Sequence, residues 1–172
     1  ILTTYIPGFE QRPTGPNSVE VPHCCNVMWG AYGIVRNQQA TNAGNLRAPL
    51  MAPLWAAGLS FAKCHAAKAV PYDAHLWYTF DGEEFSRAAR FWTRGYDFYS
   101  PSRNLVFHDY KPVPHRYDSH LKRQDHERSR HNVQRMVHMM GFPALARKMG
   151  AGDYPLQEID VYGLGDRRTI QQ

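Results

Sequence analysis

The feature that most constrains the fold of this chain is a helical pattern in residues 85–92. Its apolar side chains are spaced i, i+3, i+4 and i+7, at Phe85, Ala88, Ala89 and Trp92, so they lie on one face of a helix. A helix with one apolar face has to bury that face against another layer of structure. The chain has 172 residues, a length that suits one domain or part of a larger one.

Both ends of this helix carry sequence signals. Asp81 is expected to be the N-cap residue, with Glu84 three residues later as its capping-box partner. Arg94 and Gly95 are expected to end the helix, because glycine readily adopts the left-handed conformation that often follows a helical C-terminus.

The rest of the chain mixes strand and helix patterns. Apolar and β-branched runs predict strands in three segments, with one or two strands in the second: Ile1–Ile6, Val19–Arg36 and Asn104–His108. Two more helices are predicted, at Ala62–Ala69 and at Arg123–Met140. The polar segment Asn37–Asn45 is predicted to be an exposed turn or hairpin tip. This mixture of strands and helices predicts an α/β fold.

The net charge limits the binding partners that we expect, and the cysteines indicate the cellular compartment. A net charge of +5 is compatible with nucleic acid, an acidic membrane surface or a phosphorylated donor. We do not expect nucleic acid as the partner, judged by the clustering of basic charge, and no stretch has the length of a transmembrane helix. The three cysteines include no CxxC pair, so we expect free thiols and a cytoplasmic location.

Several short motifs follow one another in an order that is similar to a known family. They are Trp55-Ala56-Ala57-Gly58, Val70-Pro71-Tyr72-Asp73, Gly82-Glu83-Glu84, Gly95-Tyr96-Asp97-Phe98-Tyr99, Val106-Phe107-His108 and Tyr162-Gly163-Leu164-Gly165. Together they resemble the Skp1-hydroxyproline N-acetylglucosaminyltransferases, which are related in fold to the polypeptide GalNAc-transferases. The resemblance is densest over residues 54–108. It implies a GT-A-like fold with a mixed sheet flanked by helices, of which residues 1–172 would be the C-terminal, acceptor-side portion.

The resemblance also implies an activity. The family transfers N-acetylglucosamine from UDP-GlcNAc to a protein hydroxyl such as that of hydroxyproline, with retention of the anomeric configuration and with a divalent metal such as Mn²⁺. The partners would then be a UDP-sugar donor and a protein acceptor. The family's Asp-x-Asp motif, which binds the metal and the donor diphosphate, does not occur in this chain and is expected upstream of Ile1. The alternative is a non-catalytic glycosyltransferase-like module with a binding or structural role.

The acidic pair Glu83 and Glu84 is the candidate catalytic group. In GT-A enzymes an acidic pair in this place faces the acceptor, and Glu84 matches the second member of that pair. In a retaining reaction Glu84 would orient the acceptor hydroxyl and need not be a general base. The structural alternative is that both acids complement the helix dipole and that Glu84 belongs to the capping box.

His108 is the candidate metal ligand. The resemblance implies that a histidine after this predicted strand supplies a late ligand to the metal, and imidazole suits a manganese-like ion, although carboxylates are the commoner choice. The alternative is a strand-end histidine that is hydrogen-bonded to the backbone.

Four further residues are candidates for substrate binding, each with a structural alternative. Gly58 either lets the backbone approach the substrate closely or bends a buried strand. Trp55 and Trp77 either stack on a sugar ring or pack in the core. Asp73 either lines the acceptor side or makes a turn after Pro71.

A basic, histidine-rich segment runs from His115 to His138. Its helical histidines are not spaced i, i+4, so we predict a solvated basic helix face in place of a metal cluster. A contact with a diphosphate or a partner is the alternative, and it would involve Arg116, Arg123 and Arg128.

Overall fold

The computed structural model describes residues 1–12, 20–77, 79–111, 126–150 and 153–170. The four strands of its main sheet are short and have the order β4-β6-β1-β5. Strand β1 (Leu2–Thr4) pairs in parallel with β6 (Phe98–Ser100) and antiparallel with β5 (Leu59–Phe61). Strand β4 (Leu50–Ala52) pairs antiparallel with β6. The sheet is therefore mixed, and with the helices beside it the sheet confirms the predicted mixed α/β class.

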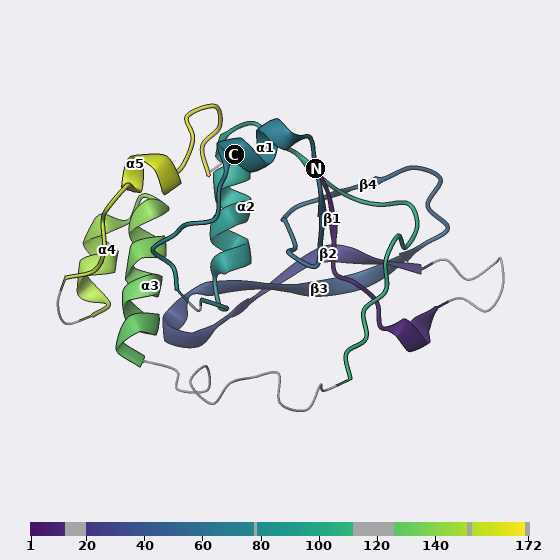
Figure 1. Ribbon diagram of the computed structural model, residues 1–172, viewed down its shortest axis with the longest axis horizontal. Helices are drawn as coiled ribbons and strands as arrows, with labels where there is room; N and C mark the ends of the chain where they lie inside the picture. The colour runs from purple at the N-terminus through teal and green to yellow at the C-terminus, as the bar shows by residue number, and fades with distance from the viewer. Residues whose placement is uncertain (13–19, 78, 112–125, 151–152, 171–172) are drawn as a thin grey trace.

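A long antiparallel hairpin forms a second sheet and runs across the molecule (Figure 1). It consists of β2 (Glu20–Trp29) and β3 (Val35–Gly44), joined through a 3₁₀ turn at Ala31–Gly33. The prediction of one or two strands in 19–36 is confirmed by β2, with β3 beginning at Val35, but the prediction that Asn37–Asn45 is a turn is wrong. These polar residues continue β3, because the hydrogen bonds to β2 satisfy their backbone while many of their side chains stay in solvent.

Helix α2 (Glu83–Thr93) stands between the strands and a helical end of the molecule (Figure 1). That end contains α3 (His126–Met139), α4 (Pro143–Lys148) and α5 (Ile159–Tyr162), and the short α1 (Cys64–Ala69) lies beside α2. A single 3₁₀ turn, Phe9–Gln11, follows β1. The helix predictions at 62–69 and 85–92 are confirmed, and so is the described part of the prediction for 123–140.

Helix α2 contributes to both hydrophobic cores. Ala88 and Phe91 belong to a core that contains Trp55 and Phe98, while Phe85 packs against the core around Met136. At the C-terminal end of α2, Gly95 has φ 87° and its N–H donates to the carbonyl of Trp92 at 2.9 Å. The predicted glycine stop is therefore confirmed.

The N-terminal end of α2 differs from the prediction. The N-cap residue is Gly82, in the left-handed region at φ 84°, and it has no side-chain cap. A β-carbon on Gly82 would lie 2.4 Å from the side chain of Ile34, so close packing as well as backbone conformation favours glycine there. Asp81 instead forms an ion pair with Arg36 at 3.3 Å. The prediction of a capping box between Asp81 and Glu84 is therefore wrong. The Glu84 carboxylate is available for other contacts.

Two further predictions are wrong. Asn104–His108 is not a strand: it makes one isolated parallel bridge, between His108 and Gly8, and the side chains of Leu105 and Val106 are exposed. Cys25 is disulfide-bonded, whereas Cys64 is free and exposed. The expectation of three free thiols is therefore wrong. The cytoplasmic location was inferred from free thiols, so that inference loses its basis. Among the described residues, the helices are too short or too polar to span a bilayer.

A buried ion pair joins the helical end to the loop before α2. Arg135 on α3 donates to both carboxylate oxygens of Asp73, at 2.8 and 3.1 Å, and the two side chains are 0% and 1% exposed. The same guanidinium also donates to the carbonyls of Pro155 and Gln157, each at 2.9 Å. One side chain therefore holds three segments that are distant in sequence.

Removing this guanidinium should be costly. We expect Arg135→Met to lower the free energy of unfolding by about 3–5 kcal/mol, because it leaves the Asp73 carboxylate buried and unpaired. The matched control is Arg36→Met, which breaks the partly exposed pair with Asp81 and should cost about 1 kcal/mol or less. Urea unfolding followed by circular dichroism measures both, and equal losses would contradict the assigned role of the buried pair.

Candidate functional site

Glu84 lies at the N-terminus of α2 and accepts two hydrogen bonds from distant parts of the chain. Its Oε2 accepts from the hydroxyl of Tyr5 at 2.6 Å, and its Oε1 accepts from the backbone N–H of Ala57 at 2.7 Å. Tyr5 follows β1, and Ala57 is exposed in the loop before β5. The carboxylate is therefore held in one orientation at the edge of the main sheet.

Tyr5 is a site residue that the sequence did not suggest. Burial, and after it the hydrogen bond to Glu84, raises the pKa of the Tyr5 phenol above its ordinary value. The phenol therefore stays protonated at neutral pH and remains a hydrogen-bond donor to Glu84. Tyr5 and Glu84 are 79 positions apart, and no local pattern links them.

Gly58 makes a close backbone approach, but to β1. A β-carbon at Gly58 would lie 3.1 Å from the carbonyl oxygen of Thr4 and 3.3 Å from the N atom of Ile6. Glycine thus lets the loop that carries Ala57 lie against the end of β1. Both groups that bind Glu84, on Tyr5 and on Ala57, are placed by this contact.

Glu83 points to a different side of α2 from Glu84. It lines a small cavity with Arg87 and Arg90, and its Oε1 has no hydrogen-bond partner among the described residues. Burial raises the pKa of Glu83, while the charge of Arg87 opposes that shift. The structure therefore separates the acidic pair, with one carboxylate fixed by hydrogen bonds and the other half-buried beside two arginines.

The remaining substrate-binding candidates are not brought together at Glu84. Trp55 is 1% exposed, and its ring centroid lies 5.9 Å from that of Phe91 in the core; the stacking role is therefore corrected to core packing. The carboxylate of Asp73 is occupied by Arg135. Trp77 is 62% exposed and lines a separate cavity of about 740 Å³ together with His131. Of these residues, Trp77 alone offers an exposed ring.

His108 is exposed and lies beside Tyr110, with their ring centroids 4.3 Å apart. Its carbonyl accepts from the N–H of Phe9 at 2.9 Å, which fixes the backbone against the Pro7-Gly8 loop. Among the described residues, no three histidine, cysteine, aspartate or glutamate side chains lie together as a metal site would require. His108 can therefore offer one ligand but does not complete a metal site with described neighbours. Arg116 and Arg123 lie outside the described residues, as do His115 and His120.

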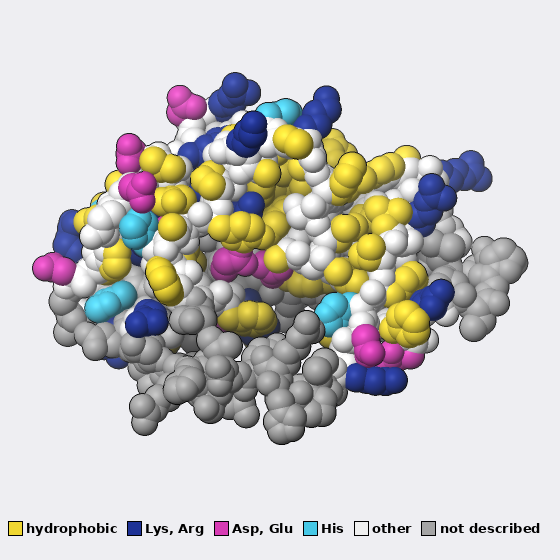
Figure 2. Space-filling view, in the orientation of Figure 1, with side chains coloured by type: hydrophobic (Ala, Val, Ile, Leu, Met, Phe, Trp, Pro, Cys, Tyr) yellow, Lys and Arg dark blue, Asp and Glu magenta, His cyan; other side chains and the backbone are white. Residues whose placement is uncertain are grey.

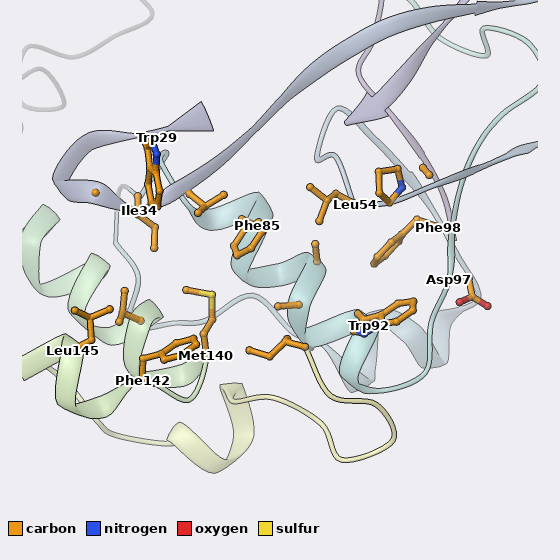
Figure 3. Close-up of a pocket in the computed structure, with 18 of the residues that line it drawn as sticks. Trp29, Ile34, Leu54, Phe85, Trp92, Asp97, Phe98, Met140, Phe142 and Leu145 are labelled. Carbon is orange, nitrogen blue, oxygen red and sulfur yellow. The ribbon is translucent and has the colours of Figure 1, made fainter. Parts of the chain in front are cut away.

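The face of the molecule seen in Figure 2 carries acidic side chains near its centre, among hydrophobic ones. A larger and mainly apolar groove, with a volume of about 880 Å³, lies between the hairpin, α2 and the helical end. Figure 3 shows Trp29 and Ile34 on the hairpin side of this groove, Phe85 and Trp92 on α2, and Phe142 opposite. Because Asp97 is the one acidic or basic residue among the described residues that line it, this part of the groove offers little to bind a diphosphate.

The raised pKa of Glu83 leads to a prediction about how the free energy of unfolding depends on pH. Its pKa is raised above the ordinary value of 4.5, so the folded chain binds more protons than the unfolded chain in the window that begins near that value. In this window the free energy of unfolding falls as the pH rises. We expect Glu83→Gln to gain stability relative to the wild type as the pH rises from 4.5 towards neutrality.

Urea unfolding at a series of pH values measures this difference. Glu10→Gln is the matched control, since it removes an exposed carboxylate and separates the effect of burial from that of lost charge. A stability difference between Glu83→Gln and the wild type that does not change with pH would contradict the prediction.

Comparison with known proteins agrees with the resemblance found in the sequence. A family model described as Glycosyltransferase (GlcNAc) matches residues 1–172. No curated protein and no solved structure matches the chain. Because the family model spans the whole described sheet, α2 and the helical end, it covers the elements that position Glu84. The chain therefore belongs to the glycosyltransferase (GlcNAc) family, the family of the Skp1 N-acetylglucosaminyltransferases.

Proposed function

We propose that this chain forms the acceptor side of an enzyme that transfers N-acetylglucosamine from UDP-GlcNAc to a hydroxyl group of a protein. The observation that carries the proposal is the fixed carboxylate of Glu84, which accepts from Tyr5 and Ala57 at the N-terminus of α2. Family membership implies a sugar donor. The protein acceptor, with hydroxyproline as a candidate hydroxyl, and the retention of configuration are parts of this proposal.

In this proposal Glu84 orients the acceptor hydroxyl. Each carboxylate oxygen can accept more than one hydrogen bond, so the contacts with Tyr5 and Ala57 leave capacity for a substrate hydroxyl. A carboxylate that is already held in place loses little freedom when the acceptor binds, which favours a reactive geometry. The raised pKa of Tyr5 supports this role, because a protonated phenol keeps donating to the carboxylate.

We further propose that the fold is GT-A-like and that the donor diphosphate is anchored mainly by a separate portion of the same domain. Two observations support this division. The 172 residues contain no Asp-x-Asp motif, and the large groove against α2 is apolar and open. In a complete domain this portion would supply the acceptor side, with Trp77 as an exposed ring for a sugar or peptide.

A divalent metal, with Mn²⁺ as the candidate, is also part of the proposal. When bound, such an ion would stabilise the leaving diphosphate as a Lewis acid. The described residues fit this role only partly, since His108 is an exposed imidazole without two further ligand side chains beside it. The remaining ligands would have to come from outside the described residues.

Substitution of Glu84 tests the central assignment. In the full-length protein we expect Glu84→Gln to reduce transfer by about a hundredfold or more, because the amide keeps the shape but loses the charge that orients the hydroxyl. Tyr5→Phe should lower kcat by about tenfold to a hundredfold through misplacement of the carboxylate. UDP binding, measured by calorimetry, should persist in both variants.

Glu158→Gln is the control for the loss of a carboxylate, because the Glu158 side chain is 57% exposed and lies at the N-cap of α5, away from Tyr5 and Ala57. It should leave transfer close to that of the wild type. Transfer by Glu84→Gln at the control rate would contradict the role of Glu84.

Substitution of His108 tests the metal assignment. We expect His108→Ala to weaken the binding of Mn²⁺ in the presence of UDP by about tenfold or more, because one of the few ligands is lost. A calorimetric titration of Mn²⁺ into the UDP-saturated full-length protein measures this without relying on turnover. An unchanged titration would remove His108 from the ligand set.

A further inference from the structure

A small cavity beside Glu83 is lined by two residues whose buried hydrogen-bond donors have no partner among the described residues. It lies between the first turns of α2 and the loop before this helix, and its volume is about 270 Å³. Its walls include Tyr72, Thr79, Glu83, Arg87 and Arg90. This cavity is separate from the contacts of Glu84, which lie with Tyr5 and Ala57.

Two buried guanidinium groups supply the unsatisfied donors. Arg87 is 7% exposed and Arg90 is 3% exposed. The Nε and Nη1 atoms of Arg87 and the Nε atom of Arg90 have no hydrogen-bond partner among the described residues. A buried donor without a partner is costly, and native structures usually satisfy such groups with protein, water or a ligand.

The Arg87 guanidinium is held rigidly. Its central carbon lies 3.4 Å from the centroid of the Tyr72 ring and 5.0 Å from that of Trp55. Its Nη2 donates to the carbonyl of Val70 at 3.1 Å. The aromatic contacts and this hydrogen bond fix the group, so a ligand that meets its remaining donors does not have to order the side chain first.

The charge balance of the cavity favours an anion. Arg87 and Arg90 face a single unpaired carboxylate, that of Glu83, because the carboxylate of Asp73 is already neutralised by Arg135. Burial lowers the pKa of Arg90 to about 10, which still leaves it cationic at neutral pH. The single carboxylate of Glu83, whose pKa is raised by burial, does not balance two guanidinium charges.

The size of the cavity limits the ligand. Pockets that hold drug-sized ligands have volumes of roughly 300–1,000 Å³, and this cavity, at about 270 Å³, lies just below that range. It suits one side chain or a small acid and is too small for a nucleotide sugar. The hydroxyl-bearing Thr79 and Ser86 add polar atoms to its walls.

We propose that this cavity binds a single carboxylate group through the unpaired N–H groups of Arg87 and Arg90. The carboxylate comes either from an acidic side chain of the polypeptide acceptor or from a small free carboxylic acid. The first source rests on the proposed function, because it requires a polypeptide acceptor at the N-terminus of α2, where Glu84 lies next to Glu83 in the chain. The second source does not depend on it.

Binding of matched probes to the full chain tests the proposal. The probes are N-acetyl-glutamate methylamide, its glutamine analogue, and propionate, which is the glutamate side chain without a backbone. We expect the glutamate probe to bind about tenfold more tightly than the glutamine probe in an NMR titration, because a charge-assisted hydrogen bond is stronger than a neutral one. Equal affinities for the two probes, or no binding by any probe, would overturn the proposal and leave water as the occupant.

Two variants locate the binding. Arg87→Gln should abolish the preference for glutamate over glutamine, while Arg147→Gln, which removes an exposed guanidinium on α4, should preserve it. Thermal unfolding followed by circular dichroism confirms that each variant is folded. If Arg87→Gln does not fold, the comparison of probes on the wild-type chain still decides the proposal. A preference that survives in a folded Arg87→Gln variant would overturn it.

The remaining probe separates the two sources. If propionate binds as tightly as the glutamate probe, the backbone contributes nothing and the ligand is a small acid. If propionate binds more weakly, peptide groups add to the affinity and the ligand is an acidic side chain. Both outcomes support carboxylate binding. Neither requires catalytic activity, so failure of the proposed function would remain distinguishable from failure of this inference.

Discussion

Helix α2 organises this fold because most of its residues are enclosed by other segments. Seven of its residues are buried: Ser86, Arg87, Ala88, Ala89, Arg90, Phe91 and Thr93. The apolar ones fill cores on either side, and the two arginines have to find acceptors because a buried charge without partners is costly. They donate to the carbonyls of Val70 and Pro71, so the loop before the helix is fixed by the helix itself.

The same loop is fixed a second time from the helical end. Asp73 pairs with Arg135 on α3, and that guanidinium also donates to two carbonyls of the segment before α5. As a result, the chain between α1 and α2 is held between two helices. This arrangement places Glu83 and Glu84 at a rigid N-terminus from which one carboxylate faces the main sheet and the other a polar cavity. The proposed acceptor site and the proposed carboxylate site thus share one helix but use different faces of it.

Much of the fold could be predicted from local patterns, and the errors share a cause. The apolar spacing of residues 85–92 and the stop at Gly95 were sufficient for α2, because both are properties of a single helix. The predictions for Asn37–Asn45 and Asn104–His108 were wrong because a segment forms a strand only where another strand pairs with it. Asn37 and its neighbours pair with β2 despite their polarity, whereas the apolar run at Leu105 finds only an isolated bridge. The family was correctly identified from motifs, since the family model matches residues 1–172.

Local motifs and periodicity were sufficient to identify the family, the mixed α/β class and Glu84 as the candidate acceptor-facing residue. The contacts of Glu84 required the folded chain, because Tyr5 and Ala57 come from the segments after β1 and before β5 and no capping box holds the carboxylate. The folded chain also decided that Trp55 is a core residue and that Arg87 and Arg90 border a cavity with unpaired donors. The physical reason is the same in each case. A residue's type limits the interactions it can make, but burial and the partners within hydrogen-bonding distance are set by segments far away in the chain.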